Sequence, residues 1–84
     1  MNLDYKNYFI LGMIGVGLNI FLSLSLKQFA TDDEIKPPKG AAKLSFKGQF
    51  MHMMVHHAQV LPMSSLIVFL VVFLSALLKD AFKL

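Results

Sequence analysis

The chain has 84 residues, of which 56% are hydrophobic and 15% are charged. This length limits it to one small domain, and so hydrophobic a chain with so little charge is not disordered. A soluble domain of this size cannot bury so much apolar surface, because small chains bury the smallest fraction of their surface on folding. The lack of cysteine excludes a disulfide framework and a zinc–cysteine cluster.

The positions of the charged residues leave two long uncharged stretches. Residues 7–26 and 48–78 contain no Asp, Glu, Lys or Arg and are 20 and 31 residues long. About 20 predominantly apolar residues in a helix cross the ~30 Å hydrocarbon core of a bilayer. Helices are expected because lipid cannot satisfy the backbone groups of an open strand. The sequence therefore predicts an all-α membrane protein, a two-span transmembrane helical hairpin that forms a single unit over residues 1–84.

The first transmembrane helix is expected over residues 8–29. Small and polar residues recur along it at spacings of 4, 3, 4 and 4 and fall on one helical face: Tyr8, Gly12, Gly15, Asn19 and Ser23. Glycine lets a second helix approach closely, and Asn and Ser form hydrogen bonds across such a contact. We therefore predict a helix-packing surface made by Gly12, Gly15, Asn19 and Ser23.

A secretory signal peptide is the alternative interpretation of this first segment. Signal peptides have apolar cores of about 7–15 residues, followed by a cleavage motif of small residues. The uncharged run here is 20 residues long and ends in SLSL, followed by KQFA, without an A-x-A pattern. We expect the segment to remain in the protein as a span.

A polar loop is expected over residues 30–44, where Pro37 and Pro38 oppose helix formation. The second helix is then expected to begin at Ser45. The Ser45 hydroxyl is placed to cap the first turn, with Gln49 near the second position of a capping box.

The second helix is expected over residues 45–79. About 34 residues at 1.5 Å per residue give a length of ~50 Å, which exceeds the bilayer core. Its first part is therefore expected to lie along the membrane interface, to protrude or to pack against protein. Pro62 is expected to kink the helix.

The second helix begins in a methionine-rich segment that holds all three histidines of the chain. His52 and His56 are spaced i, i+4 on one face, and His57 lies about 100° away. Imidazole with thioether suits copper, and imidazole alone suits zinc or haem iron. We name His52, His56 and His57 as candidate cofactor-binding residues and assign no particular metal. The alternatives are interfacial histidines that bond headgroups, water or a partner's backbone, and a proton relay.

The motifs of known chemistries are missing from the sequence. It has no nucleotide-binding glycine loop, H-E-x-x-H motif or paired carboxylates on a helix, and its acids lie outside the predicted spans. The chain is therefore not expected to be an enzyme on its own. Its lysines are dispersed among acids without interleaved aromatic residues, so nucleic acid is not an expected partner.

The expected function is that of a small accessory or structural subunit of a larger integral-membrane complex, of the respiratory or another redox type. It would pack through the Gly/Asn/Ser face of the first helix and the His/Met face of the second, with other integral-membrane subunits and the lipid bilayer as partners. One alternative is that the His/Met segment binds copper, haem or a pigment jointly with a partner chain. A second is a homo-oligomeric pore lined by Asn19 or by His52 and His56. The expected location is a bacterial or archaeal cytoplasmic membrane or the inner membrane of an organelle.

Overall fold

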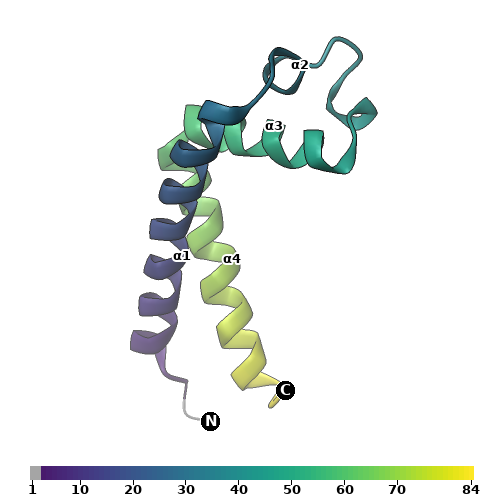
Figure 1. Cartoon of the computed structure of the whole chain (residues 1–84). Helices are drawn as coiled ribbons and strands as arrows, with labels where there is room; N and C mark the ends of the chain where they lie inside the picture. The colour runs from purple at the N-terminus through teal and green to yellow at the C-terminus, as the bar shows by residue number, and fades with distance from the viewer. Residues whose placement is uncertain (1–2) are drawn as a thin grey trace.

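The computed structural model describes residues 3–84 and is all-helical, with 82% helix and no strand among those residues. It measures 50 × 21 × 16 Å along its principal axes. Two long helices, α1 (Tyr5–Leu26) and α4 (Leu61–Ala81), lie side by side, and both chain termini lie at the same end of the pair (Figure 1). Both helices are long and apolar enough to cross a membrane.

The first predicted helix corresponds to α1 and the turn that follows it. The Asp4 side chain caps α1 by accepting a hydrogen bond of 3.1 Å from the backbone N–H of Asn7. The 3₁₀ turn η1 (Lys27–Phe29) continues α1 at its other end. The helical segment therefore begins earlier than the expected residue 8 and ends in a tighter turn.

The connection over residues 30–44 contains two short helical turns. The first, α2 (Asp32–Ile35), is held by a capping box in which the Thr31 hydroxyl accepts from the Glu34 N–H at 3.3 Å. The Glu34 carboxylate in turn accepts from the Thr31 N–H at 2.8 Å. The second turn, η2 (Ala41–Lys43), follows Gly40, whose φ of 89° lies in the region that favours glycine.

The second half of the chain differs from the single kinked helix expected over residues 45–79. It forms α3 (Phe46–Gln59) and α4, which are separated at Val60, with φ −130° and ψ 51°. Pro62 lies in the first turn of α4, where a missing N–H costs nothing because first-turn amides have no intrahelical partner. The chain therefore bends before Pro62, and α3 turns away from the two long helices (Figure 1).

The start of α3 has the Ser45 cap that the sequence predicts, but it lacks the predicted capping box. The Ser45 hydroxyl accepts from the Gly48 N–H at 3.1 Å, as predicted. Gln49 instead donates from Nε2 to the carbonyls of Leu44 at 3.1 Å and Ala42 at 3.4 Å. A capping box needs its second residue three positions after the cap, and Gln49 is four positions after it.

Small residues of α1 let α4 approach closely. A Cβ atom at Gly12 would lie 2.6 Å from Cδ2 of Phe69, and one at Gly15 would lie 3.1 Å from Val72 and 3.2 Å from Val68. The Gly/Asn/Ser face of α1 therefore lies against α4 of the same chain. Its buried residues are Tyr8, Gly12, Asn19 and Ser23.

Tyr8 lies near the end of the hairpin at which the chain terminates, which we call the open end. Its side chain is 1% exposed there. Its hydroxyl donates a hydrogen bond of 2.5 Å to Oδ2 of Asp80, near the end of α4. Its ring packs edge-on against Phe73 and Tyr5, with ring centroids 5.7 and 6.0 Å apart. The two long helices are thus joined at this end by a hydrogen bond within an aromatic cluster.

Candidate functional site at the helix elbow

A group of polar side chains meets where α1, the end of α3 and the start of α4 come together. We call this group the elbow cluster, and its members are Asn19, Ser23, His57, Ser64 and Ser65. Asn19, Ser23 and Ser64 are 8%, 0% and 4% exposed. Burial of polar groups costs free energy unless they are hydrogen-bonded. Within residues 3–84, no buried side-chain nitrogen or oxygen lacks a partner.

The carboxamide of Asn19 links the three helices. Its Nδ2 donates to the hydroxyl oxygens of Ser64 at 3.0 Å and Ser65 at 3.3 Å. Its Oδ1 accepts from the Ser23 hydroxyl at 3.5 Å and lies 2.8 Å from Nδ1 of His57. Ser64 donates its own proton to the His57 carbonyl at 3.1 Å, which leaves its oxygen free to accept from Asn19. Asn19 is therefore hydrogen-bonded on both sides of its amide group.

This network determines which nitrogen of His57 carries a proton. Because Oδ1 of Asn19 can only accept, Nδ1 of His57 must donate. In the neutral ring, Nε2 is then the nitrogen with the free lone pair. Histidines that ligate metals are oriented in the same way, with one ring N–H bonded to an oxygen and the other nitrogen open.

A groove of about 220 Å³ adjoins His57 on the inner side of the bend between α3 and α4. Its walls are mainly apolar and include two thioethers. The lining residues are Met53, His56, His57, Val60, Met63, Ser64 and Ile67. The groove therefore brings together two of the three candidate histidines, His56 and His57, two thioether sulfurs and an apolar surface.

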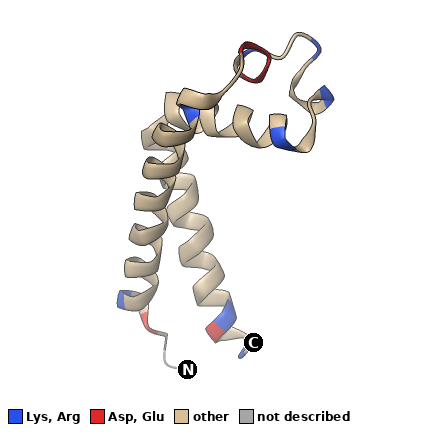
Figure 2. Ribbon diagram, viewed as in Figure 1, with Lys and Arg blue, Asp and Glu red and all other residues tan. Residues whose placement is uncertain are grey.

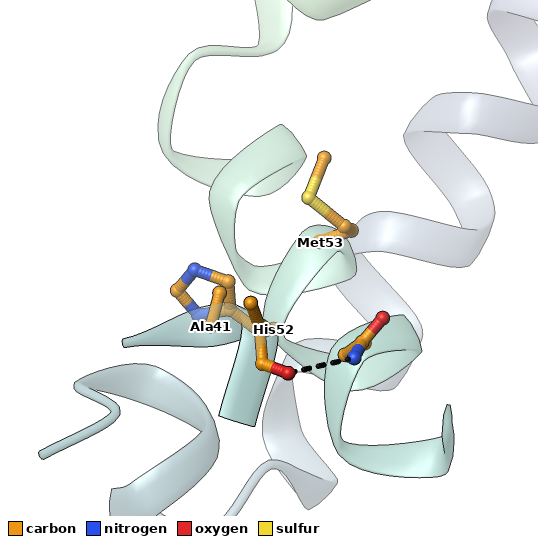
Figure 3. Close-up of a pocket in the computed structure, with 5 residues that line it drawn as sticks. Ala41, His52 and Met53 are labelled. Carbon is orange, nitrogen blue, oxygen red and sulfur yellow. Dashed lines mark hydrogen bonds between the residues drawn. The ribbon is translucent and has the colours of Figure 1, made fainter. Parts of the chain in front are cut away.

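His52 lies on another side of α3. Its Nδ1 is 2.6 Å from the carbonyl oxygen of Glu34 and so donates to α2. It also lines a smaller cavity of about 120 Å³ between α3 and η2, together with Ala41 and Met53 (Figure 3). His52 thus helps to fix α2 against α3.

The three candidate histidines do not converge on one point. His56 is exposed, and its ring is stacked 6.2 Å from that of His52, with 29° between the ring planes. His52 bonds to α2, whereas His57 bonds to Asn19. Among residues 3–84 there is no group of three or more His, Asp or Glu side chains that could hold a metal ion. A metal here would need thioether ligands or ligands from another chain.

Comparison of the chain with protein-family models, with curated proteins and with solved structures finds no match.

The sequence placed Asn19 on a packing surface and His57 among the candidate ligands, but it did not connect them. They are 38 residues apart, and helical periodicity relates only residues within one helix. The sequence did contain a signal for this contact, namely polar residues within each long apolar stretch. Polar side chains in such stretches form hydrogen bonds with a neighbouring helix. Ser64 and Ser65, next to the bend, were the complementary polar pair.

Proposed function

We propose that the chain is an integral-membrane helical hairpin with two spans, which serves as a small structural subunit of a larger membrane complex. The main support for this proposal is that most residues of the two long helices are not buried within the chain. In the most apolar 18-residue stretch of each span, 17% of the residues are buried for α1 with η1, and 6% for α4. Core helices of soluble proteins are mostly buried. Surfaces this apolar and exposed need a lipid or protein surrounding.

The outer sides of the long helices are covered by large apolar side chains. They include Phe9, Met13, Ile14, Leu18, Phe21, Leu66, Ile67, Val71 and Leu74. Leaving such surface in water costs about 25 cal/mol for each Å². The 21 residues of α4 extend ~31 Å, which matches a hydrocarbon core of ~30 Å. Length and surface both support a transmembrane orientation.

The charged residues lie at the two ends of the hairpin and leave its middle uncharged (Figure 2). The open end carries Asp4, Lys6, Lys79, Asp80 and Lys83, and the other eight lie between Lys27 and Lys47. Lysines at the ends of a span extend their apolar stems and place the ammonium group among lipid headgroups. This separation of charge supports two membrane boundaries.

The small internal core supports a role within an assembly. The buried hydrophobic residues of the described chain are Tyr8, Met51 and Val55. A hairpin of two helices buries little surface, so its stability depends on lipid and on bound partners. Because α4 occupies the Gly/Asn/Ser face of α1, that face is not open to another subunit. The outer sides of α1 and α4 and the groove beside His57 remain open to partners.

The test is purification of the tagged full chain from its native membrane in mild detergent, followed by native electrophoresis and mass spectrometry. We expect a particle several times heavier than the 9.4 kDa chain, with integral-membrane partners in fixed stoichiometry. Phe21→Ala, on the outer side of α1, should weaken the assembly, whereas Phe82→Ala, beyond the end of α4, should not. A monodisperse monomer or a small homodimer would overturn the proposal.

A second candidate function is cofactor ligation by His57 together with a partner chain. The observation that favours it is the hydrogen bond from Nδ1 to Asn19, which orients the ring and leaves Nε2 as the open nitrogen. Met53 and Met63 line the adjoining groove, and thioether with imidazole suits copper, while imidazole alone also suits haem iron or a pigment metal. A redox complex is the assembly that this arrangement fits best.

Metal analysis and an absorption spectrum of the purified assembly test this second function. Copper, a haem band or a pigment band should be present and should be lost in His57→Ala but retained in His52→Ala, since His52 bonds to α2. An assembly that contains neither metal nor pigment would contradict cofactor ligation by His57. A homo-oligomeric pore has less support, because Asn19 is 8% exposed and hydrogen-bonded inside the hairpin.

A further inference from the structure

Helix α3 runs across the end of the hairpin and has two different faces (Figure 1). One face is covered by the preceding segment. Its buried residues are Gly48, Met51 and Val55, and the nearby His52 bonds to the Glu34 carbonyl of α2 at 2.6 Å. The loop and α2 therefore cover the side of α3 that is directed away from the long helices.

The other face of α3 is apolar and uncovered. Phe46, Phe50, Met53 and His57 recur at spacings of 4, 3 and 4 and share this face. The side chains of Phe46, Phe50 and Met53 are 90%, 46% and 46% exposed. We call these three residues the foot surface.

The contact between His57 and Asn19 shows which way the foot surface is directed. Asn19 lies seven residues before Leu26, the last residue of α1, which is about 10 Å along the helix axis. To reach it, the His57 side chain must extend from α3 back toward the open end of the hairpin. Phe46, Phe50 and Met53 share its face and so are directed toward the level of the spans.

The charges around α3 are unevenly distributed. Lys43 and Lys47 flank the start of α3, next to Phe46, whereas the acids of this end, residues 32–34, lie in α2 on the covered side (Figure 2). An in-plane amphipathic helix has this arrangement, with large apolar residues toward the acyl chains and lysines at the headgroups. Basic residues next to a span attract anionic lipid by about 1 kcal/mol each, which is about fivefold.

We propose that α3 lies in the plane of one leaflet, with the foot surface among the acyl chains and with Lys43 and Lys47 on the phosphates of anionic phospholipids. This inference rests on the proposed membrane location. The occupant is lipid because the foot surface lies at the level where the spans leave the membrane and because its flanking charges are positive.

Tryptophan fluorescence tests this placement, since the chain contains no tryptophan. The full-length variants Phe50→Trp, Leu70→Trp and Lys39→Trp are reconstituted separately in vesicles whose phospholipids are brominated at defined depths. Trp at 50 should be quenched most by bromine near the headgroup end of the acyl chain, and Trp at 70 by deeper bromine. Trp at 39, in the loop, should remain unquenched.

The outcomes distinguish this inference from the proposed function. Deep quenching at 70 without quenching at 50 overturns the in-plane helix and leaves the two spans intact. Quenching at neither position overturns both. Blue-shifted emission at 50 without quenching means that protein, such as a second copy, covers the foot surface, and this also overturns the proposal.

The lipid class is tested in the same vesicles with brominated phosphatidylglycerol or brominated phosphatidylcholine. Quenching at 50 should be stronger with phosphatidylglycerol. Lys43→Gln with Lys47→Gln should remove this preference, about fivefold for each lysine. Lys79→Gln with Lys83→Gln, which removes the same charge from the open end, should leave it unchanged. The assignment of anionic lipid is contradicted if the preference for phosphatidylglycerol survives Lys43→Gln with Lys47→Gln. It is also contradicted if quenching at 50 shows no such preference when all lysines are present.

Discussion

The carboxamide oxygen of Asn19 lies 2.8 Å from Nδ1 of His57 and joins α1, about two turns before its end, to the last turn of α3. The same carboxamide donates to Ser64 and Ser65 at the start of α4. One side chain therefore holds together the three helices that meet at the bend. This relationship fixes both the direction of α3 and the orientation of the His57 ring.

Replacement of Asn19 should destabilise the hairpin. Asn19→Ala leaves Ser64, Ser65 and His57 without their shared partner, and the expected loss is about 1–2 kcal/mol of unfolding free energy. Denaturation of the reconstituted chain with increasing SDS measures it. Asn7→Ala, the same substitution at an exposed position, should change stability little. Equal effects of the two variants would contradict the role of Asn19.

Glycines at positions 12 and 17 should respond oppositely to alanine. A Cβ at Gly12 would lie 2.6 Å from the ring of Phe69, which packs against Phe73 with 5.7 Å between centroids and so cannot move freely. Gly12→Ala should cost about 1–3 kcal/mol. At Gly17 nothing lies within 4 Å, so alanine should be neutral or stabilise by up to about 1 kcal/mol. The same SDS titration compares the two, and tolerance of Gly12→Ala would show that α4 does not pack closely there.

The Tyr8 hydroxyl should contribute to closure of the open end. Tyr8→Phe removes the hydrogen bond to Asp80 and keeps the ring, so we expect the free energy of unfolding to fall. Hydrogen exchange of the backbone amides of residues 8–11 in α1 and of the last turn of α4 should accelerate, since these amides are hydrogen-bonded within their helices. Tyr5→Phe is the control, because the Tyr5 side chain is 57% exposed. Unchanged exchange in Tyr8→Phe would show that the hydrogen bond does not hold the ends together.

The bend between α3 and α4 should depend on the elbow cluster more than on Pro62. Pro62→Ala restores a backbone N–H in the first turn of α4, where it has no intrahelical partner. If α3 and α4 straightened into one helix, the hydrogen bonds of His57 with Asn19 and Ser64 would be lost. Spin labels at positions 47 and 78 should therefore report the same distance in Pro62→Ala. In Asn19→Ala the distance distribution should broaden. A straightened chain in Pro62→Ala would assign the bend to proline instead.

The helical content of the fold was largely predictable from the placement of charge. Both uncharged stretches are largely helical, the first in α1 and the second in α3 and α4, because the positions of Asp, Glu, Lys and Arg mark which segments are apolar. The bend was misplaced at Pro62 because proline is tolerated in a first turn, so its position in sequence marks the neighbourhood of a helix boundary and not the boundary itself. The bend at Val60 accompanies the contact of His57 with Asn19, which lies 38 residues away and appears in no local pattern.

The packing surface of α1 shows a second limit of sequence reasoning. The spacing of Gly12, Gly15 and Asn19 indicates a contact with another helix, but periodicity does not say whether that helix belongs to the same chain. Here α4 occupies the surface, with Phe69 against Gly12. Likewise, the spacing of His52 and His56 did not reveal that His52 bonds to α2.

We propose that α1 and α4 cross a membrane and place their shared open end on one side and the α3 end on the other. Because the chain has no cysteine, Lys39→Cys, Lys83→Cys and Leu70→Cys can each be labelled with a membrane-impermeant maleimide in intact and in opened vesicles. We predict that positions 39 and 83 are labelled from opposite sides and that position 70 is protected until detergent is added. Labelling of 39 and 83 from the same side, or of 70 without detergent, would contradict the account.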